Sequence, residues 1–387
     1  MGRAVFLLSL AAFASAASLR ATDPLLPLLA ADFGVTTGAA SAAVTAFALS
    51  YGLLQVVCGP LGDRYGRYRT IAAAAVVSAF GSAACAIAPS LDTLVAARFV
   101  SGATIGAFIP LALAWIGDTV AYEQRQPLLA RFLVGQMAGV AFGTAAAGWL
   151  GEHFGWRAIF LALGGLLLLI AVLLIAEIKT NPLAGRAGAG RGAIGQSVKR
   201  MPGLVMHPRL RALIATGFTE GLLIFGPLAF IPAYLQITFA VGPGLAGTLV
   251  AIYAAGGVLY ALLARRAVRR LGEQGLVALG GAALVIGYVT LASAGSPALA
   301  TLGIGALGAG FYMLHTTVQT HVTQVAPEER GSAVALFATF LFLGQASGVW
   351  LAARVVDAAG MTPVFLGAAA GLAALAALLR YFLSGGT

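Results

Sequence analysis

The sequence predicts an all-α membrane protein with twelve transmembrane helices in two six-helix bundles. Three observations carry this prediction: the composition, the number of apolar runs and a repeat between the two halves. Hydrophobic residues make up 60% of the 387 residues and charged residues only 9%, whereas a soluble domain carries about 25% charged residues. A soluble fold of this length cannot bury so much apolar surface, so we expect the chain to lie in a lipid bilayer.

Twelve apolar runs lie between polar breaks, and each is close to the roughly 20 residues that a helix needs to cross the hydrocarbon core. One break is longer: residues 179–209 are rich in glycine and basic residues and are predicted to be a linker. It separates an N-terminal bundle, 1–178, from a C-terminal bundle, 210–387. The predicted spans are 4–30, 39–61, 70–89, 93–118, 128–150, 157–178, 210–238, 245–264, 276–293, 298–324, 331–355 and 362–383.

The first apolar run has a second interpretation. Its small residues Ala-Ser-Ala at 14–16 fit the cleavage site of a signal peptide. Cleavage after Ala16 would remove half of the first helix and leave an odd number of spans. The favoured interpretation is therefore a complete first helix that carries two charged residues, Arg20 and Asp23.

The distribution of basic residues predicts the orientation in the membrane. With the N-terminus inside, eighteen Lys and Arg residues fall in inner segments, and two, Arg157 and Arg354, fall in outer segments. Cytoplasmic segments carry such an excess, so both termini and the linker are predicted to be cytoplasmic, in an inner membrane of the bacterial type. The same asymmetry accounts for the net charge of +10 without a nucleic-acid partner.

The two halves of the chain repeat at an offset of about 205 residues. The segment VAYEQRQ at 120–126 falls on VAPEERG at 325–331. A constant offset at several helix ends implies an internal duplication, as in transporters whose binding site lies between the repeats. Further pairs at this offset are Gly139 with Gly344, Gly143 with Gly348, and Pro27 with Pro232.

The segment GPLGDRYGRYR, residues 59–69, stands between the second and third predicted helices on the basic side. It resembles the signature loop of the major facilitator superfamily, G-x-L-x-D-R-x-G-R, whose members are secondary transporters with twelve helices. Asp63 is expected to face a helix N-terminus in the other half, and Arg67 is expected to pair with Asp118. The alternative is a basic loop that only sets the topology. The resemblance implies a cytoplasmic gate formed by Gly59, Asp63, Arg64, Gly66, Arg67 and Asp118.

Other segments resemble motifs of the same superfamily. RFVSG at 98–102 resembles the R-x-x-x-G pattern of its fourth helix, which implies that Arg98 takes part in proton coupling. GVAFGTAAAG at 139–148 is similar to the glycine motif of its proton-driven exporters, with Thr144 where those carry proline. The loop ARRAVRRLG at 264–272 is the expected counterpart of the gate loop, and it keeps the bases but has lost the acid.

Charged residues inside the bilayer cost at least ~2.5–3.5 kcal/mol on insertion scales, so each needs a partner or a function. Arg20 and Asp23 lie one turn apart on the first helix, and Arg98 is predicted at a similar depth on the fourth. In the superfamily these two helices line the central cavity, which implies an Arg20–Asp23–Arg98 cluster that faces the substrate. The alternative is a structural ion pair that braces the two helices.

The second half has one acidic residue within its predicted spans, Glu220, expected near the midplane as a proton or substrate site. The alternative is a carboxyl group satisfied by the nearby Thr216 or Thr219. His315 and Gln319 share a helix face and form either a proton relay or an interhelical hydrogen bond. Gln136 on the fifth helix is a further polar candidate.

The sequence contains no phosphate-binding glycine loop with lysine, no paired nucleophile and base, and no metal-ligand spacing. We therefore predict no enzyme activity, no metal and no cofactor, and a proton gradient as the energy source. The expected function is proton-coupled export of a small organic solute by alternating access, by a monomer in the lipid bilayer. The alternatives are a proton symporter that takes up an organic anion and, in another class, a non-transporting receptor or scaffold.

Overall fold

The computed structural model describes residues 2–120, 122–186, 203–325 and 330–384, so most of the predicted linker lies outside the described ranges. In these ranges every regular element is helical. Eleven helical runs are long and apolar enough to cross a membrane. One of them, α14 (Pro243–Ser293), has 51 residues and non-helical backbone at Gly272. It therefore supplies two crossings, and the described residues contain the predicted twelve.

The first half contains six crossings. The first of them is interrupted after Arg20, and a short 3-10 turn begins at Asp23, because Pro24 and Pro27 lack the N–H groups that a continuous helix needs. The elements are α1 (Gly2–Arg20), η1 (Asp23–Leu25), α2 (Leu26–Phe33), α3 (Thr37–Ala40), α4 (Ala42–Tyr65), α5 (Arg67–Ala86), α6 (Leu91–Ile105), α7 (Phe108–Thr119), α8 (Tyr122–Phe154) and α9 (Arg157–Thr180).

The second half repeats this pattern. Its first crossing is also interrupted: α11 ends at Glu220 and is followed by a π-helical turn, a feature often found at functional sites. The elements are α11 (Pro208–Glu220), η2 (Gly221–Phe225), α12 (Gly226–Leu228), α13 (Ile231–Phe239), α14, α15 (Pro297–Val325), α16 (Arg330–Ala359) and α17 (Thr362–Ser384).

The turns of the two halves correspond. In the described residues, positive φ angles occur at six positions, and these form three pairs separated by 205 or 206 residues. Gly66 and Gly272 form one such pair, with φ angles of 93° and 61° that glycine adopts without steric cost. The backbone conformation of the turns thus repeats at the same spacing as the sequence. The other pairs are Gly34 with Ala240, and Gly155 with Gly360.

Close helix packing follows the same offset. Gly139 and Gly143 of α8 lie against the backbone of Phe13 and Ala17 in α1. In the second half, α16 packs on the crossing that contains α11 and η2 in the same way, because small residues let two backbones approach closely. There Gly344 lies against Phe218, and Gly348 lies against Leu222.

We expect Gly344→Leu to destabilise the protein, because a Cβ at this position would overlap the backbone carbonyl of Phe218. Overpacking of a tight contact costs about 1–3 kcal/mol. Thermal unfolding in detergent measures the effect, and Gly367→Leu is the control, since a Cβ at Gly367 meets nothing within 4 Å. Equal melting temperatures for the two variants would contradict the packing argument.

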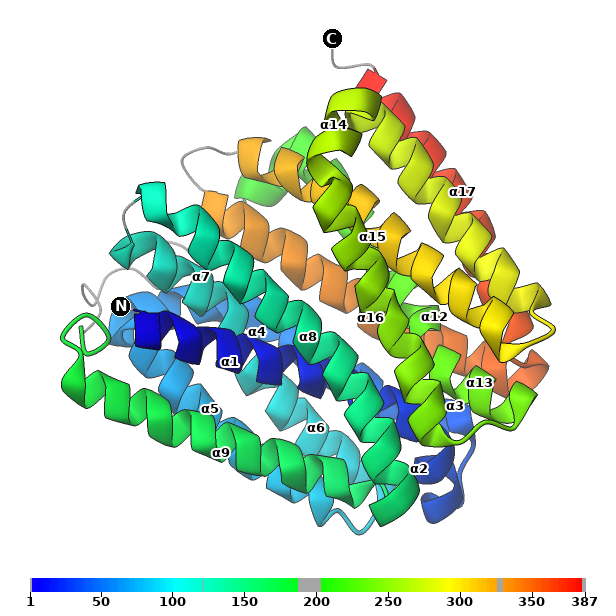
Figure 1. Cartoon of the computed structure of the whole chain (residues 1–387), viewed down its shortest axis with the longest axis horizontal. Helices are drawn as coiled ribbons and strands as arrows, with labels where there is room; N and C mark the ends of the chain where they lie inside the picture. The colour runs from blue at the N-terminus through cyan, green and yellow to red at the C-terminus, as the bar shows by residue number, and fades with distance from the viewer. Residues whose placement is uncertain (1, 121, 187–202, 326–329, 385–387) are drawn as a thin grey trace.

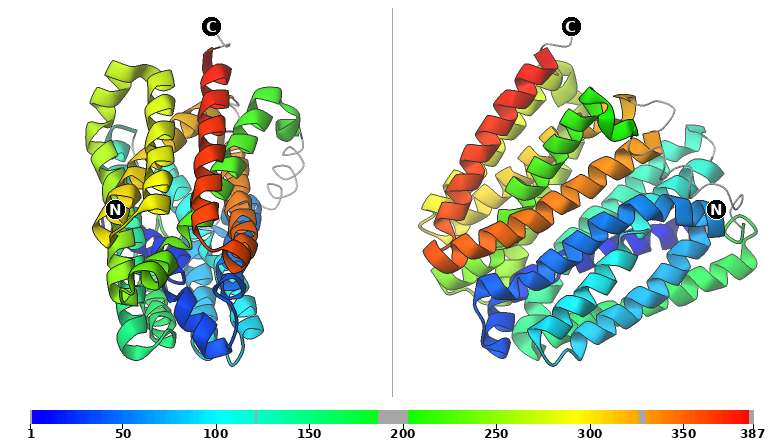
Figure 2. Two further views of the ribbon diagram at one scale, coloured as in Figure 1. Left: turned by 90° about the vertical axis from the view of Figure 1, so that its right-hand side faces the viewer. Right: turned by 180° about the vertical axis from the view of Figure 1, so that it is seen from behind.

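The two halves form two groups of helices that meet at one end (Figures 1 and 2). Between them α8 packs against α14, and α4 packs against α16. In Figure 1 the groups meet near α2, α3 and α13 and diverge toward the side that carries the start of α1 and the end of α17. We call this diverging side, which holds the 59–69 segment, the loop-motif side, and the other the closed side.

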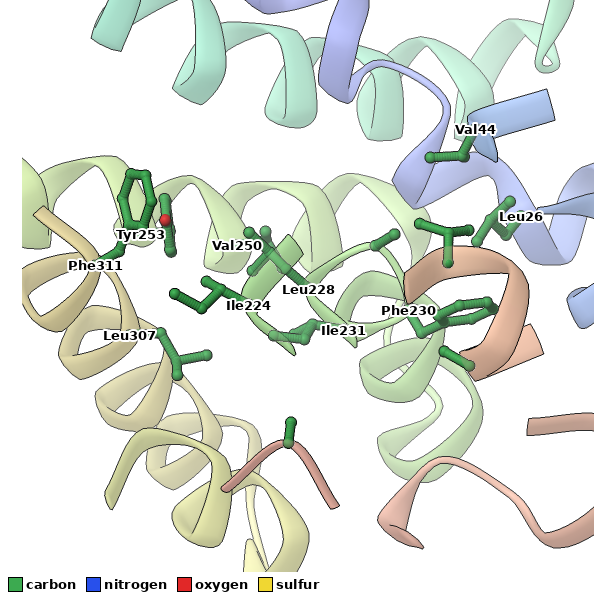
Figure 3. Close-up of a cluster of buried hydrophobic side chains, with 14 of the residues drawn as sticks. Leu26, Val44, Ile224, Leu228, Phe230, Ile231, Val250, Tyr253, Leu307 and Phe311 are labelled. Carbon is green, nitrogen blue, oxygen red and sulfur yellow. The ribbon is translucent and has the colours of Figure 1, made fainter. Parts of the chain in front are cut away.

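An apolar cluster joins the two halves at the closed side. Leu26 and Val44 of the first half belong to the same cluster of buried side chains as Phe230 of the second half, and Figure 3 shows the three near one another. A second cluster consists of buried residues from the first half. The apolar core therefore holds the halves together away from the loop-motif side.

Candidate functional site

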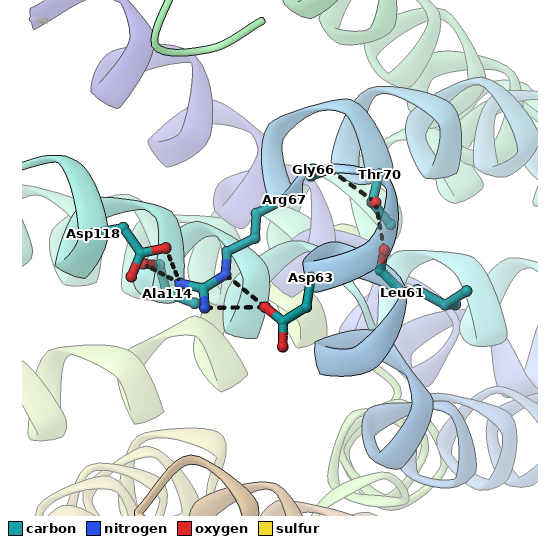
Figure 4. Close-up of polar contacts among 7 residues, drawn as sticks. All are labelled: Leu61, Asp63, Gly66, Arg67, Thr70, Ala114 and Asp118. Carbon is teal, nitrogen blue, oxygen red and sulfur yellow. Dashed lines mark hydrogen bonds and ion pairs between the residues drawn. The ribbon is translucent and has the colours of Figure 1, made fainter. Parts of the chain in front are cut away.

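The 59–69 segment forms an ion-pair network inside the first half (Figure 4). Arg67 at the start of α5 bonds to Asp63 of α4 at 3.1 Å and to Asp118 of α7 at 2.5 Å. Its Nη1 also donates to the carbonyl oxygen of Ala114 at 2.7 Å. The expected Arg67–Asp118 pair is thus present, and it ties three helix ends together.

The expected contact of Asp63 with a helix N-terminus in the second half is not formed among the described residues. Asp63 bonds to Arg67 instead, on the side where the two halves diverge in Figure 1. Arg64 is exposed, and its guanidinium lies 5.0 Å from the ring centre of Tyr65. Gly59 is exposed on α4. Gly66 makes the turn between α4 and α5.

Arg20 and Asp23 form a buried ion pair at the break in the first crossing. The Nη1 of Arg20 lies 3.2 Å from Oδ2 of Asp23, and the two side chains are only 5% and 2% exposed. The guanidinium of Arg20 also lies 4.8 Å from the ring centre of Phe225 in η2. This cation–π contact brings the charge pair of the first half against the π-helical turn of the second.

Arg98 forms no direct ion pair with Asp23 among the described residues, although its charge lies close enough to interact electrostatically with that carboxylate, as the predicted cluster requires. Its Nη1 donates to the carbonyl oxygen of Ser18 at 3.1 Å, and its Nε donates to that of Ala43 at 3.4 Å. The guanidinium also lies 3.9 Å from the ring centre of Phe47. Backbone carbonyls of α1 and α4 therefore bind two of the three guanidinium nitrogens, and Arg98 connects α6 to both helices.

Glu220 and His315 form a second buried pair, in the second half. Oε2 of Glu220 lies 2.9 Å from Nδ1 of His315, and the Glu220 side chain is fully buried. Thr216 and Thr219 bond to backbone carbonyls of their own helix, so they do not satisfy Glu220. The pair connects the end of α11, just before the π-helical turn, to α15.

The other polar candidates stand apart from these pairs. Gln319 is exposed and Gln136 is half-buried, and among the described residues neither bonds to Arg20, Asp23, Arg98, Glu220 or His315. A relay from His315 to Gln319 is thus not formed. Within the described part of the chain, no group of three or more His, Cys, Asp or Glu residues is placed to hold a metal ion.

Several buried polar atoms near the pairs have no partner among the described residues. They include one carboxylate oxygen each of Asp23 and Glu220, and both amide atoms of Gln345. An unpaired buried polar group is costly, so a bound proton, water molecule or substrate would stabilise these atoms. Each carboxyl group thus holds one partner and keeps one oxygen available.

Aromatic rings connect the two pairs, and sequence reasoning missed most of them. Phe225, which contacts the guanidinium of Arg20, packs edge-on against Phe311 with ring centres 4.8 Å apart. Phe311 in turn stacks on the ring of His315, also with ring centres 4.8 Å apart. The repeat contained a signal for one of these contacts, since Phe225 is the residue at an offset of 205 from Arg20. The sequence has no comparable signal for Phe311.

Comparison with known proteins finds similar membrane transporters. The chain is 25% identical over 367 residues to the multi-drug resistance efflux pump PmrA of Streptococcus pneumoniae serotype 4, a match that covers 91% of this chain and 89% of that protein. It is also 25% identical over 249 residues to the uncharacterized MFS-type transporter YwfA of Bacillus subtilis. That match covers 64% of this chain and spans 60% of the length of YwfA.

A solved structure of the xylose transporter XylE from E. coli, in a partially occluded inward-open conformation, has the same fold. The TM-score is 0.73 at 14% sequence identity, with 100% of this chain and 97% of the other covered. The family model described as Major Facilitator Superfamily matches residues 8–349. Since this match spans most of the chain, the protein belongs to the major facilitator superfamily of membrane transporters.

Proposed function

We propose that this transporter exports a small organic solute in exchange for protons. The observation that carries the proposal is the pair of buried carboxyl groups, Asp23 and Glu220, one in each half. Each has a basic partner and one unpaired oxygen. Ionisable residues inside a membrane transporter most often mark the path of an ion or substrate. The similarity to a multi-drug efflux pump supports export.

Exchange would follow if protons and substrate compete for the same two carboxylates. A proton that binds Glu220 or Asp23 neutralises the carboxylate and weakens its bond to His315 or Arg20. A substrate with a positive charge or a hydrogen-bond donor would instead bind the ionised carboxylate. The proton and the substrate therefore exclude one another at the site, which is the requirement for exchange.

Uptake of an organic anion with protons is the second candidate. Two buried guanidinium groups of the first half, those of Arg20 and Arg98, favour it. Together with Asp23 they leave a net charge of one positive unit. An Nη2 atom of Arg98 has no partner among the described residues. An anionic substrate could use this excess charge. A non-transporting receptor or scaffold remains the alternative of another class.

Flux across purified proteoliposomes with an imposed pH gradient tests these functions. We expect lipophilic organic cations and neutral compounds to move against their gradient, driven by protons moving the opposite way. Proton-driven accumulation of an organic anion, with no exchange of cations, would support the symporter instead. A protein that transports neither class in a broad panel would contradict both and favour a receptor or scaffold.

The remaining expectations belong to this proposal. We propose that the protein works as a monomer in a bacterial inner membrane, with both termini in the cytoplasm and without a cofactor. The loop-motif side would then be the cytoplasmic side, and the described conformation would be open toward the cytoplasm. The basic residues of the loop-motif side, among them Arg64 and Arg67, support this orientation.

A further inference from the structure

The closed side contains two carboxylate contacts between the halves. Asp357, near the end of α16, accepts a hydrogen bond from the backbone N–H of Gly38 at 2.9 Å. Its other oxygen accepts from the hydroxyl of Thr36 at 2.6 Å. Gly38 lies in the first turn of α3, so a carboxylate of the second half binds the N-terminus of a helix in the first half.

Glu152, near the end of α8, makes the reciprocal contact. One of its oxygens accepts a hydrogen bond from the backbone N–H of Gly244 at 2.8 Å. Gly244 lies in the first turn of α14. Here a carboxylate of the first half binds the N-terminus of a helix in the second half. We call the two contacts the Asp357 clasp and the Glu152 clasp.

The internal repeat relates the two clasps. Glu152 and Asp357 are 205 residues apart, and Gly38 and Gly244 are 206 apart. Both glycines are needed for the approach, because a Cβ at Gly38 would lie 2.5 Å from Cγ of Asp357, and one at Gly244 would lie 2.7 Å from an oxygen of Glu152. N–H groups in the first turn of a helix have no partner within the helix, and the helix dipole favours an anion there.

We infer that the two clasps are a symmetric latch, which holds the closed side shut and favours the conformation that opens on the loop-motif side. Each clasp joins one half to the other, so both must break when the halves separate at this end. On the loop-motif side, the Arg67 network lies within one half and does not oppose opening. The inference concerns the conformational equilibrium and does not depend on which solute is carried.

The expected effect of each clasp is moderate because both carboxylates are exposed. A hydrogen bond to a charged group is worth roughly tenfold or more in an equilibrium constant, and exposure to solvent reduces this gain. We therefore expect Glu152→Ala and Asp357→Ala each to raise the ratio of closed-side-open to closed-side-shut molecules about three- to tenfold. The clasps share no residue, so the effects should multiply in the double variant.

Spin labels on cysteines introduced at the exposed Asp92 and Ser293, at the closed-side ends of α6 and α14, report the distance between the halves. The native Cys58 and Cys85 are buried and stay in place. The control is Asp32→Ala, which removes a carboxylate on the same side that bonds to Trp156 and Arg157 within the first half. We expect longer distances in the clasp variants and an unchanged distribution in the control.

A double variant with the wild-type distance distribution would overturn the inference, as would an equal shift in the control. If the double variant does not fold, Thr36→Val offers a milder test, since it removes one bond to Asp357 and keeps the charge. A smaller increase of the spin-label distance in Thr36→Val supports the latch. Unchanged distances in Thr36→Val and in both single Ala variants contradict it.

Discussion

Glu220→Gln is expected to abolish proton-driven transport while leaving exchange of substrate between the two sides of the membrane. The carboxyl group is fully buried and is held by His315 at 2.9 Å, with its second oxygen unpaired. Gln has nearly the same shape but cannot bind and release a proton. If Glu220 carries the coupled proton, the carrier can still alternate, but a pH gradient no longer drives it.

The measurement is substrate flux in proteoliposomes, with and without a pH gradient, beside substrate counterflow without a gradient. Glu273→Gln is a matched control, because Glu273 also pairs with a histidine, His321, at 3.0 Å. The side chains of Glu273 and His321 are 53% and 26% exposed, and they lie beside the Gly272 break in α14 and near the end of α15. Proton-driven flux that survives in Glu220→Gln would show that the proton binds elsewhere.

His315→Asn distinguishes a proton relay from a structural contact. If the histidine passes the proton to Glu220, its loss should slow proton-driven flux and change the dependence of flux on pH. If it only holds the carboxylate in place, proton-driven flux and substrate counterflow without a gradient should fall to the same extent. The stacking of His315 on Phe311 at 4.8 Å fixes the ring in either case.

Most of the fold could be predicted from the sequence, because hydropathy sets where a chain crosses the bilayer. The predicted spans 39–61 and 157–178 lie within the described Thr37–Tyr65 and Arg157–Thr180. The gap predicted between 264 and 276 is helical except at Gly272. Its arginine-rich segment favours helix, so low hydropathy marked the end of the membrane span and not the end of the helix.

The site was harder to predict because it depends on which helices approach one another. Depth along each helix placed the charges of Asp23 and Arg98 near each other, and they do interact, but depth did not predict that the carbonyls of Ser18 and Ala43 are the direct partners of Arg98. The pairing of Glu220 with His315 joins residues 95 positions apart, and neither position has a charged partner at the offset of the repeat. Hydropathy and repeats locate helices, whereas side-chain pairing between helices depends on their rotation and tilt.

The second large effect is expected in a double-mutant cycle at the buried Arg20–Asp23 ion pair. Arg20→Leu leaves Asp23 buried without its partner, and Asp23→Leu does the same to Arg20. Breaking a buried ion pair at one end costs about 3–5 kcal/mol, whereas replacing both partners by apolar residues is often neutral or stabilising. We therefore expect both single variants to unfold at markedly lower temperature in detergent, and Arg20→Leu/Asp23→Leu to recover most of the loss.

The double variant then separates the two roles that the sequence left open. If the pair only braces the structure, a stable double variant should transport as the wild type does. If Asp23 takes part in coupling, the double variant should fold but lose proton-driven flux, and this is the result we expect from the unpaired oxygen of Asp23. The Arg157–Asp32 pair is the control for the cycle. Its side chains are 45% and 44% exposed, and its coupling energy should stay below about 1 kcal/mol.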